Sequence, residues 1–398
     1  MKIKKTLFLG VCLAIFLTRI FWYDLRVVFE SARQDGLGAM FVAYAAALAP
    51  FIVASFTLGV RTLLRSRLLL FYIFLMAYGL AIAVYHRQVD SLYVYQDLFK
   101  LSFVPTTAVL VAFARPGLSC ATLEKVGFFA LICLFAKFTA SALYSTRGLY
   151  YGTAADLFPF CVFAAMFACR KSNRNLKTAV LSAASLALVV LGKKRTLAVA
   201  LVFTVAFLFQ RSLRHNRWAF PILGFMCAIF VIGVSVARST PIEEMLFARL
   251  SAPGANVEES TRGEEIRRVY ETLRDHSGVA VVTGFGHGAT FKIGSDKKSS
   301  KSSDAKHSVH FTPAAMHLRY GLFGWVLLGW TGWVAVLGGS RMLTGDIIPF
   351  SVALRAYAIA ASIASLGMFG LIDDMVVGAA IGLTIDTESV VPPPLNAA

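Results

Sequence analysis

The amino-acid sequence predicts an all-α polytopic membrane protein, with about twelve transmembrane helices and one large polar loop. Three observations support this fold class. Of the 398 residues, 57% are hydrophobic and only 15% are charged. The mean hydropathy is +0.68, which is too apolar for a soluble protein of this length. Apolar runs of about 20 residues, the length that crosses a bilayer as a helix, recur along the chain.

The apolar runs predict the individual spans. They are rich in Phe, Leu and Ala on all sides, so a polar residue inside a span needs a specific reason. The first run follows "MKIKK" and looks like a signal peptide, but no small-residue cleavage site follows it, which predicts an uncleaved first span. The predicted spans are 6–22, 37–60, 67–85, 99–114, 126–144, 153–169, 177–192, 196–210, 218–237, 312–338, 349–371 and 375–386.

The charges in the short loops predict the orientation. If the N-terminus is cytoplasmic, that side carries roughly twice as many Lys and Arg residues as the opposite side. The positive-inside rule therefore places both termini in the cytoplasm and the odd-numbered connections outside. The net charge of +17 comes mostly from these short loops, and this distribution does not favour nucleic-acid binding.

The cysteines do not indicate a metal centre. No CxxC pair and no Cys/His cluster with zinc-ligand spacing occurs, so we expect neither a disulfide framework nor a zinc site. The six cysteines, nearly all of them inside apolar runs, are Cys12, Cys120, Cys133, Cys161, Cys169 and Cys227.

One long polar segment, 238–311, divides the chain into three parts. Residues 1–237 hold the first nine predicted spans, and residues 312–398 hold the last three and a cytoplasmic tail. The predicted topology places the segment outside, and its length is too great for a simple connector. We therefore expect a large periplasmic loop with structure of its own.

An amphipathic helix is predicted within this loop. Ser260 or Thr261 is expected as its N-cap, and Glu264 and Arg268 have the spacing of an i,i+4 ion pair. Arg262 lies four residues before the first apolar position, on the apolar face, where either a structural ion pair or a ligand contact explains it. The apolar face is formed by Ile266, Val269, Tyr270 and Leu273.

The stretch "LGKKRTL" places three cations, Lys193, Lys194 and Arg195, between the seventh and eighth spans. Its position is on the outer face, against the topology signal, and the charges have the wrong sign for the start of a helix. Two explanations remain open. The side chains snorkel to anionic lipid headgroups, or they form an anion site at the outer leaflet.

The loop ends with two further features. In "VAVVTGFGHG" a β-like apolar run leads into Gly284, Gly286 and Gly288, which permits close approach of the backbone to an anion, but no helix follows as in a nucleotide-binding motif. A low-complexity tether, 294–306, then leads to His310 at the outer membrane boundary.

These features occur in an order that resembles the O-antigen ligase superfamily. The matching residues are Arg195-Thr196 opening a span, Arg262 leading an amphipathic helix, "GFGHG", and His310 beginning a span that reads on to "GLFG" at 321–324. The superfamily includes ligases that join O-antigen to lipid A-core in Gram-negative bacteria, and related polysaccharide polymerases. The motif-bearing part is about 186–328. Two departures are Phe311, where the family often has Asn, and a second histidine, His307.

The resemblance implies a fold like that of the membrane-embedded C-type glycosyltransferases and activity at the periplasmic face of the bacterial inner membrane. The donor would be a glycan on undecaprenyl diphosphate and the acceptor would be lipid A-core, without metal or nucleotide. Under this reading His310 is the general base, and direct displacement inverts the anomeric centre. Arg195 and Arg262 stabilise the leaving diphosphate.

Further residues receive secondary roles in this reading. Lys193 and Lys194 add positive charge near the diphosphate, and Arg147 in the outer turn "STRGLYYG" is another candidate. Asp374 or its neighbour Asp373 orients the histidine or binds acceptor sugar. Lys137, inside the fifth span, is expected to snorkel toward the outer interface rather than bind substrate.

Two alternatives remain. A polymerase of the same superfamily would use the same donor chemistry and differ only in its acceptor. The single large loop after the ninth span favours the ligase. A transporter or lipid flippase is the alternative from another class, but such proteins often show internal repeats, and no convincing repeat is seen in this sequence.

Overall fold

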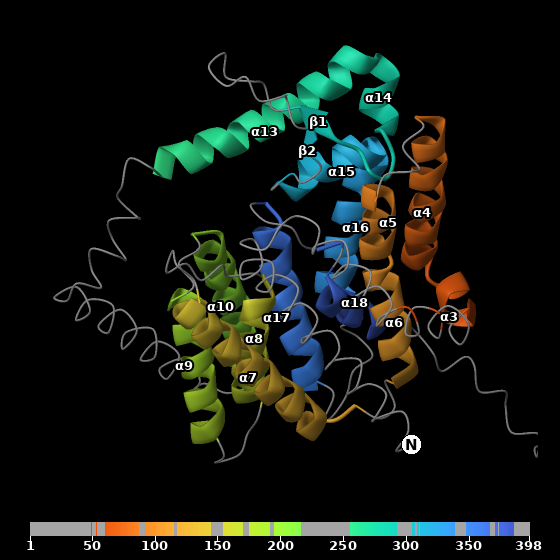
Figure 1. The fold of residues 1–398 in the computed structure, drawn as a ribbon. Helices are drawn as coiled ribbons and strands as arrows, with labels where there is room; N and C mark the ends of the chain where they lie inside the picture. Colours follow the sequence, from red (N-terminus) through yellow and green to blue (C-terminus); the bar gives the residue numbers. More distant parts are fainter. Residues whose placement is uncertain are drawn as a thin grey trace, which may run out of the picture.

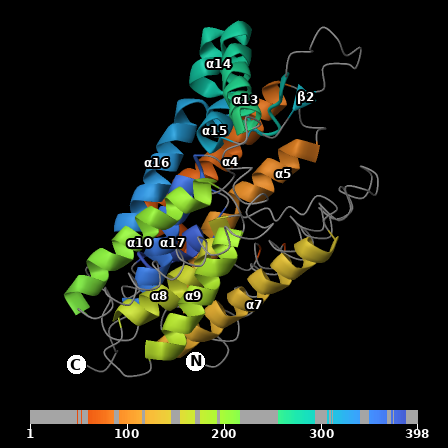
Figure 2. The same cartoon turned by 90° about the vertical axis from the view of Figure 1, so that its left-hand side faces the viewer.

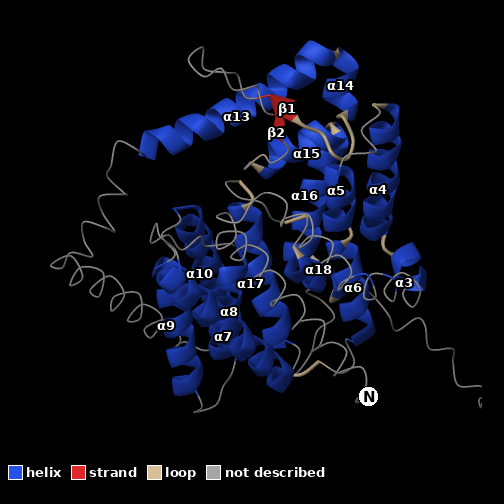
Figure 3. Ribbon diagram, viewed as in Figure 1, coloured by secondary structure: helices blue, strands red, loops and turns tan. Residues whose placement is uncertain are grey.

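The described part of the chain is mostly helical, as the sequence predicts (Figures 1 and 3). Within the described residues of this computed structural model, the strands are limited to one antiparallel pair of two residues each, with Phe291 opposite Lys306. The structure describes residues 49, 53, 60–86, 92–114, 118–144, 154–169, 175–191, 195–215, 255–292, 305–306, 309, 311–338, 348–366, 371–372 and 374–385.

The helices before the polar segment are α3 (Val60–Arg65), α4 (Arg67–Tyr85), α5 (Leu92–Leu101), α6 (Phe103–Ala114), α7 (Cys120–Tyr144), the 3-10 helix η2 (Ala154–Leu157), α8 (Phe158–Cys169), α9 (Asn175–Leu191) and α10 (Arg195–His215). The elements after them are α13 (Ala255–His276), α14 (Gly278–Thr283), β1 (Phe291–Lys292), β2 (Ala305–Lys306), α15 (Thr312–Tyr320), α16 (Leu322–Leu337), α17 (Ile348–Ala364) and α18 (Met375–Gly382).

Most predicted spans that fall on described residues correspond to helices. α4 has the bounds predicted for the third span, and α9 and α10 begin within two residues of the predicted positions. The tenth predicted span is divided into α15 and α16 at Gly321, whose φ of 56° suits glycine and whose missing side chain lets the backbone of α14 pass close by. The predicted spans 6–22 and 218–237, and nearly all of 37–60, lie outside the described residues.

Within the described residues, α4 alone is both long enough, at 19 residues, and apolar enough to cross a membrane, judged by length and composition. Shorter apolar helices occupy Ala154–Cys169, Leu176–Val189, Val199–Gln210, Leu322–Leu337 and Ile348–Ala364. The number of spans and their orientation therefore stay predictions.

A bundle of long helices forms the main core, with α17 packed between α8, α10 and α18 (Figures 1 and 2). Large side chains such as Phe160, Phe163 and Tyr357 are fully buried there. The close packing of α18 against α6 depends on small residues, because a Cβ on Gly378 would lie 2.6 Å from the backbone oxygen of Val104.

A second apolar cluster lies outside this core. It joins α13, α14 and α15 through Val269 and Leu273 of α13, Ala280 of α14 and Leu318 of α15. We call residues 255–292 and 311–320 the α13–α15 module. In Figure 1 its helix α13 extends across one end of the bundle. Other side chains of α15, Met316 and Tyr320, belong to the main core, so α15 joins the module to the bundle.

Candidate functional site

The structure places the helices that carry the two predicted catalytic arginines. Arg195 is the first residue of α10, and Arg262 lies in the first half of α13. The side chains of these two residues lie outside what the structure describes. The other candidates outside the described residues are His310, His307, Lys193, Lys194, Arg147 and Asp373.

The elements beside these residues meet at one end of the bundle. The connections 170–174 and 192–194 are short, so α8, α9 and α10 alternate in direction and α10 begins at the same end as η2. η2 also packs against α17. The backbone N–H of Thr312, at the start of α15, donates to the carbonyl of Ser365 just past the end of α17, at 3.2 Å. The start of α15, which follows His310 in the sequence, therefore lies at the end of α17.

The fold itself uses the carboxylate of Asp374, which contacts Tyr357 near the middle of α17. Asp374 is the N-cap of α18, and its Oδ1 accepts hydrogen bonds from the backbone N–H groups of Val376 and Val377. Its Oδ2 accepts a 2.6 Å hydrogen bond from the Tyr357 hydroxyl. The residue is fully buried. These contacts account for an aspartate at this position through helix capping, without a substrate.

Lys137 does not snorkel, contrary to the sequence prediction. Its side chain is buried, and Nζ lies 3.2 Å from Oδ1 and 3.3 Å from Oδ2 of Asp156 in η2. The prediction was wrong because the apolar run of α7 does not reveal a carboxylate 19 residues further along that folds back onto the lysine. A buried charge is tolerated when it has such a partner.

The predicted amphipathic helix is present as α13, and its apolar positions Val269 and Leu273 are fully buried. The predicted pair is also present, with Arg268 Nε 2.7 Å from Glu264 Oε1. Hydrogen bonds from Arg267 and Arg268 lower the pKa of Glu264. The N-cap prediction was wrong, because α13 begins at Ala255 and the expected cap residues lie inside it. The helix-breaking residues Pro253 and Gly254 immediately precede the start of α13 in the sequence.

The glycine-rich loop, residues 284–288, contacts protein rather than an anion. The backbone N–H of Phe285 donates to the Leu318 carbonyl, and the N–H of Gly286 donates to the Arg319 carbonyl. The next two N–H groups, of His287 and Gly288, donate to the carbonyl of Gly79 and to a carboxylate. Since these four amides have protein acceptors, the loop does not present them to a phosphate.

The apolar run before this loop is a helix and not a strand. α14 is capped by Ser277, whose Oγ accepts from the backbone N–H of Ala280. A run of four apolar residues does not distinguish a buried helix from a strand by periodicity, and the serine cap is the local signal that favours the helix.

Sequence reasoning missed a buried ion pair between α5 and α15. Arg319 Nε donates to Oδ2 of Asp97 at 2.7 Å, and the backbone N–H of Gly288 donates to the same oxygen at 2.9 Å. Both charged residues are less than 10% exposed. The available signal was an arginine inside the predicted span 312–338, since an ionisable residue in an apolar span needs a partner.

His287 lies beside this pair. Its Nε2 lies 3.1 Å from the Met76 carbonyl, which only accepts, so Nε2 carries the proton. Nδ1 then accepts from the Tyr320 hydroxyl at 3.0 Å. Burial lowers the pKa of His287, so the imidazole is neutral at neutral pH.

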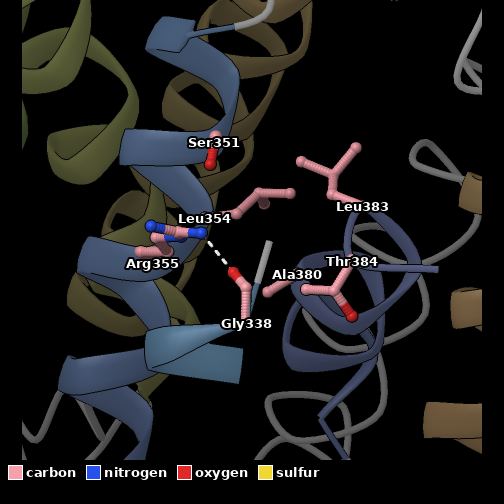
Figure 4. A pocket seen from close by; sticks show the side chains of 7 residues that line it. All are labelled: Gly338, Ser351, Leu354, Arg355, Ala380, Leu383 and Thr384. Atoms are coloured by element: carbon pink, nitrogen blue, oxygen red, sulfur yellow. Dashed lines mark hydrogen bonds between the residues drawn. The ribbon is translucent and has the colours of Figure 1, made fainter. Parts of the chain in front are cut away.

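A narrow cavity, too small to hold a water molecule, lies between α16, α17 and α18 (Figure 4). Arg355 of α17 points toward the end of α16, and its guanidinium donates to the Gly338 carbonyl. Ser351 and Thr384 add the other polar groups. The cavity lies at the end of α16 away from α15.

No family model and no curated protein sequence matches the chain. Within the described residues, no group of three or more His, Cys, Asp or Glu side chains is arranged to hold a metal ion.

Proposed function

We propose that this chain is a membrane-embedded glycosyltransferase of the O-antigen ligase type. It transfers a glycan from undecaprenyl diphosphate to a sugar hydroxyl of lipid A-core at the periplasmic face of the bacterial inner membrane. The observation that supports this most is the meeting of three elements at one end of the bundle: the start of α10, the end of α17 and the start of α15. Arg195 is the first residue of α10, and His310 precedes α15 in the sequence by two residues.

The membrane location is supported by the distribution of apolar and charged residues. Large apolar side chains on α4 and α16, such as Phe74 and Trp333, are exposed, whereas Lys137 and Arg319 are buried and paired with carboxylates. A protein surrounded by lipid has this arrangement, because lipid tails accept apolar side chains and charged groups must find partners inside. The charges of the short loops support a cytoplasmic position for both termini.

The chemistry assigns one role to each predicted group. The acceptor oxygen attacks the anomeric carbon while the bond from that carbon to the phosphate oxygen breaks, and the electron pair leaves on the diphosphate. His310 accepts the hydroxyl proton. Arg195 and Arg262 stabilise the charge that develops on the phosphates, as metal ions do in other enzymes. Attack opposite the leaving group inverts the anomeric centre.

The test is a transfer assay with purified protein, undecaprenyl-diphosphate-linked glycan and lipid A-core, with EDTA present. We expect glycan on lipid A-core from the unchanged chain and its loss in Arg195→Ala and His310→Ala. Lys177→Ala is the matched control, because Lys177 is 67% exposed and pairs with Glu124 near the starts of α9 and α7, at the other end of the bundle. It is expected to keep full activity.

The alternatives give different products. Longer lipid-linked glycan without modified lipid A-core would show a polymerase. Full activity in His310→Ala would remove the general-base assignment. If folded protein transfers glycan to neither acceptor, the ligase proposal is wrong, and a flippase becomes the hypothesis to test with lipid-linked glycan in vesicles.

A further inference from the structure

The buried ion pair between Asp97 and Arg319 joins distant parts of the chain. Asp97 lies in α5, and Arg319 lies 222 residues later, near the end of α15. The same carboxylate oxygen also binds the backbone N–H of Gly288, at the end of the glycine-rich loop. One oxygen atom therefore holds both the loop and α15 against α5.

The loop between these contacts is fixed to α4 and α15 along its length. The His287 N–H donates to the Gly79 carbonyl at 3.0 Å, and the Phe285 N–H donates to the Leu318 carbonyl at 2.9 Å. The fit is tight, because a Cβ on Gly286, whose φ is 82°, would lie 2.5 Å from the Gly79 oxygen. The Tyr78 hydroxyl of α4 also donates to the carbonyl at the end of α14, at 2.8 Å.

The α13–α15 module extends from these contacts. Val269 and Leu273 of α13 are buried in one cluster with Phe285 of the loop and with Ala315 and Leu318 of α15. His317 of α15 lies 2.8 Å from the Val281 carbonyl of α14. The module is therefore one packed unit. The contacts of Asp97 attach it to α5, and those of Gly79 and Tyr78 attach it to α4.

We propose that Asp97 and Arg319 are positioning residues, which fix the α13–α15 module on the helix bundle. This places the start of α15, next to His310, at the end of α17, and it fixes the direction in which α13 carries Arg262. The structural part of the inference stands by itself. Its consequence for catalysis rests on the proposed function.

Direct contact of this pair with substrate is disfavoured by the geometry. Asp97 is 4% exposed and Arg319 is 7% exposed. The carboxylate oxygen that receives Arg319 also receives Gly288. Positioning can still have a large effect on rate, because a displacement of about 1 Å at catalytic groups can cost roughly 100-fold.

The attachment is tested by a distance measurement that does not need activity. Spin labels are introduced as Val279→Cys on α14 and Val202→Cys on α10, two exposed positions, in a chain whose six native cysteines are replaced. With Asp97 and Arg319 unchanged, the two labels are expected to give one narrow distribution of distances. Asp97→Asn keeps an acceptor oxygen but leaves the charge of Arg319 uncompensated, and we expect it to broaden this distribution.

A double variant separates positioning from folding. Asp97→Leu with Arg319→Met replaces both charges with apolar groups of similar volume, which usually preserves stability, but it removes the acceptor for Gly288. We expect this variant to fold, to show a broadened distance, and to lose about 10- to 100-fold in kcat, with the KM for the donor changed by less than about threefold. The single variant Arg319→Lys, which keeps the positive charge, is expected to have a kcat between that of the double variant and that of the unchanged chain. Lys177→Ala is the control.

The outcomes are distinct. The inference would be overturned if the folded double variant kept the wild-type distance distribution and the wild-type kcat. A broad distance distribution in the labelled protein with Asp97 and Arg319 unchanged would also overturn it. A broadened distance with unchanged kcat would show attachment without a positioning role and would also overturn it. If the unchanged chain transfers no glycan, the proposed function fails, while the distance measurement still decides the attachment.

Discussion

Replacing Lys137 tests how much the buried ion pair with Asp156 stabilises the helix bundle. Its Nζ is 3.2 Å from Asp156 Oδ1, and both side chains are about 95% or more buried. At this separation the Coulomb attraction is about 5 kcal/mol for an effective dielectric constant of ~20. Part of this attraction offsets the cost of removing the two charges from water. The loss in free energy of unfolding on replacing the lysine is therefore the cost of leaving the buried carboxylate unpaired, about 3–5 kcal/mol. We expect Lys137→Met to lose that much stability.

The assay compares unfolding of purified variants in the same detergent. Lys177→Met removes an exposed lysine of a comparable ion pair and should cost at most about 1 kcal/mol. Lys137→Met with Asp156→Leu removes both buried charges and should recover most of the loss. Equal stability of Lys137→Met and Lys177→Met would refute the reasoning, because a snorkelling lysine is expected to be as dispensable as an exposed one.

Three further predictions concern the same regions. Tyr357→Phe removes the hydroxyl that donates to Asp374 and should cost about 1.5–3 kcal/mol in denaturant unfolding. Gly286→Ala places a Cβ against the backbone of α4 at a φ of 82° and should lower the free energy of unfolding by about 1–3 kcal/mol or more. Gly263→Ala, in an open helical position, should leave the free energy of unfolding unchanged or raise it slightly. Burial lowers the pKa of His287 below 6.5, so the unfolded chain binds more protons than the folded one between the two pKa values. Its contribution to stability is complete above pH 6.5 and is lost as the pH falls through the folded-state pKa. Thermal unfolding from pH 8 to 5 should therefore show a smaller loss of stability in His287→Gln than in the unchanged chain.

The sequence predicted the helices well because their signals are local. Apolar runs gave α4 its observed bounds, and i,i+4 spacing gave the Glu264–Arg268 pair of α13. The predicted unbroken span 312–338 failed at Gly321, where the break depends on the backbone of α14 passing close by. That neighbour comes from another part of the chain, so composition alone did not reveal it.

The candidate site was only partly predictable for the same reason. The partner of Arg319 is 222 residues away, and no spacing rule connects it to Asp97. Asp374 was expected to serve substrate, but its contacts are those of a helix cap, and it begins α18 in the pattern of an N-cap before an apolar run. The "GFGHG" stretch suggested close backbone approach, and the approach is to α4 and α15.

Arg195 and Arg262 can be separated from cations such as Lys137 by what their loss changes. A structural cation has a carboxylate inside the fold, so its removal lowers stability, as expected for Lys137→Met. A cation that serves a substrate diphosphate leaves no carboxylate unpaired when it is replaced. Arg195→Ala and Arg262→Ala should therefore unfold within about 1 kcal/mol of the unchanged chain while transfer falls at least about 100-fold. Stability losses of about 3 kcal/mol in both variants would instead assign these arginines to the fold and remove the main support for the diphosphate site.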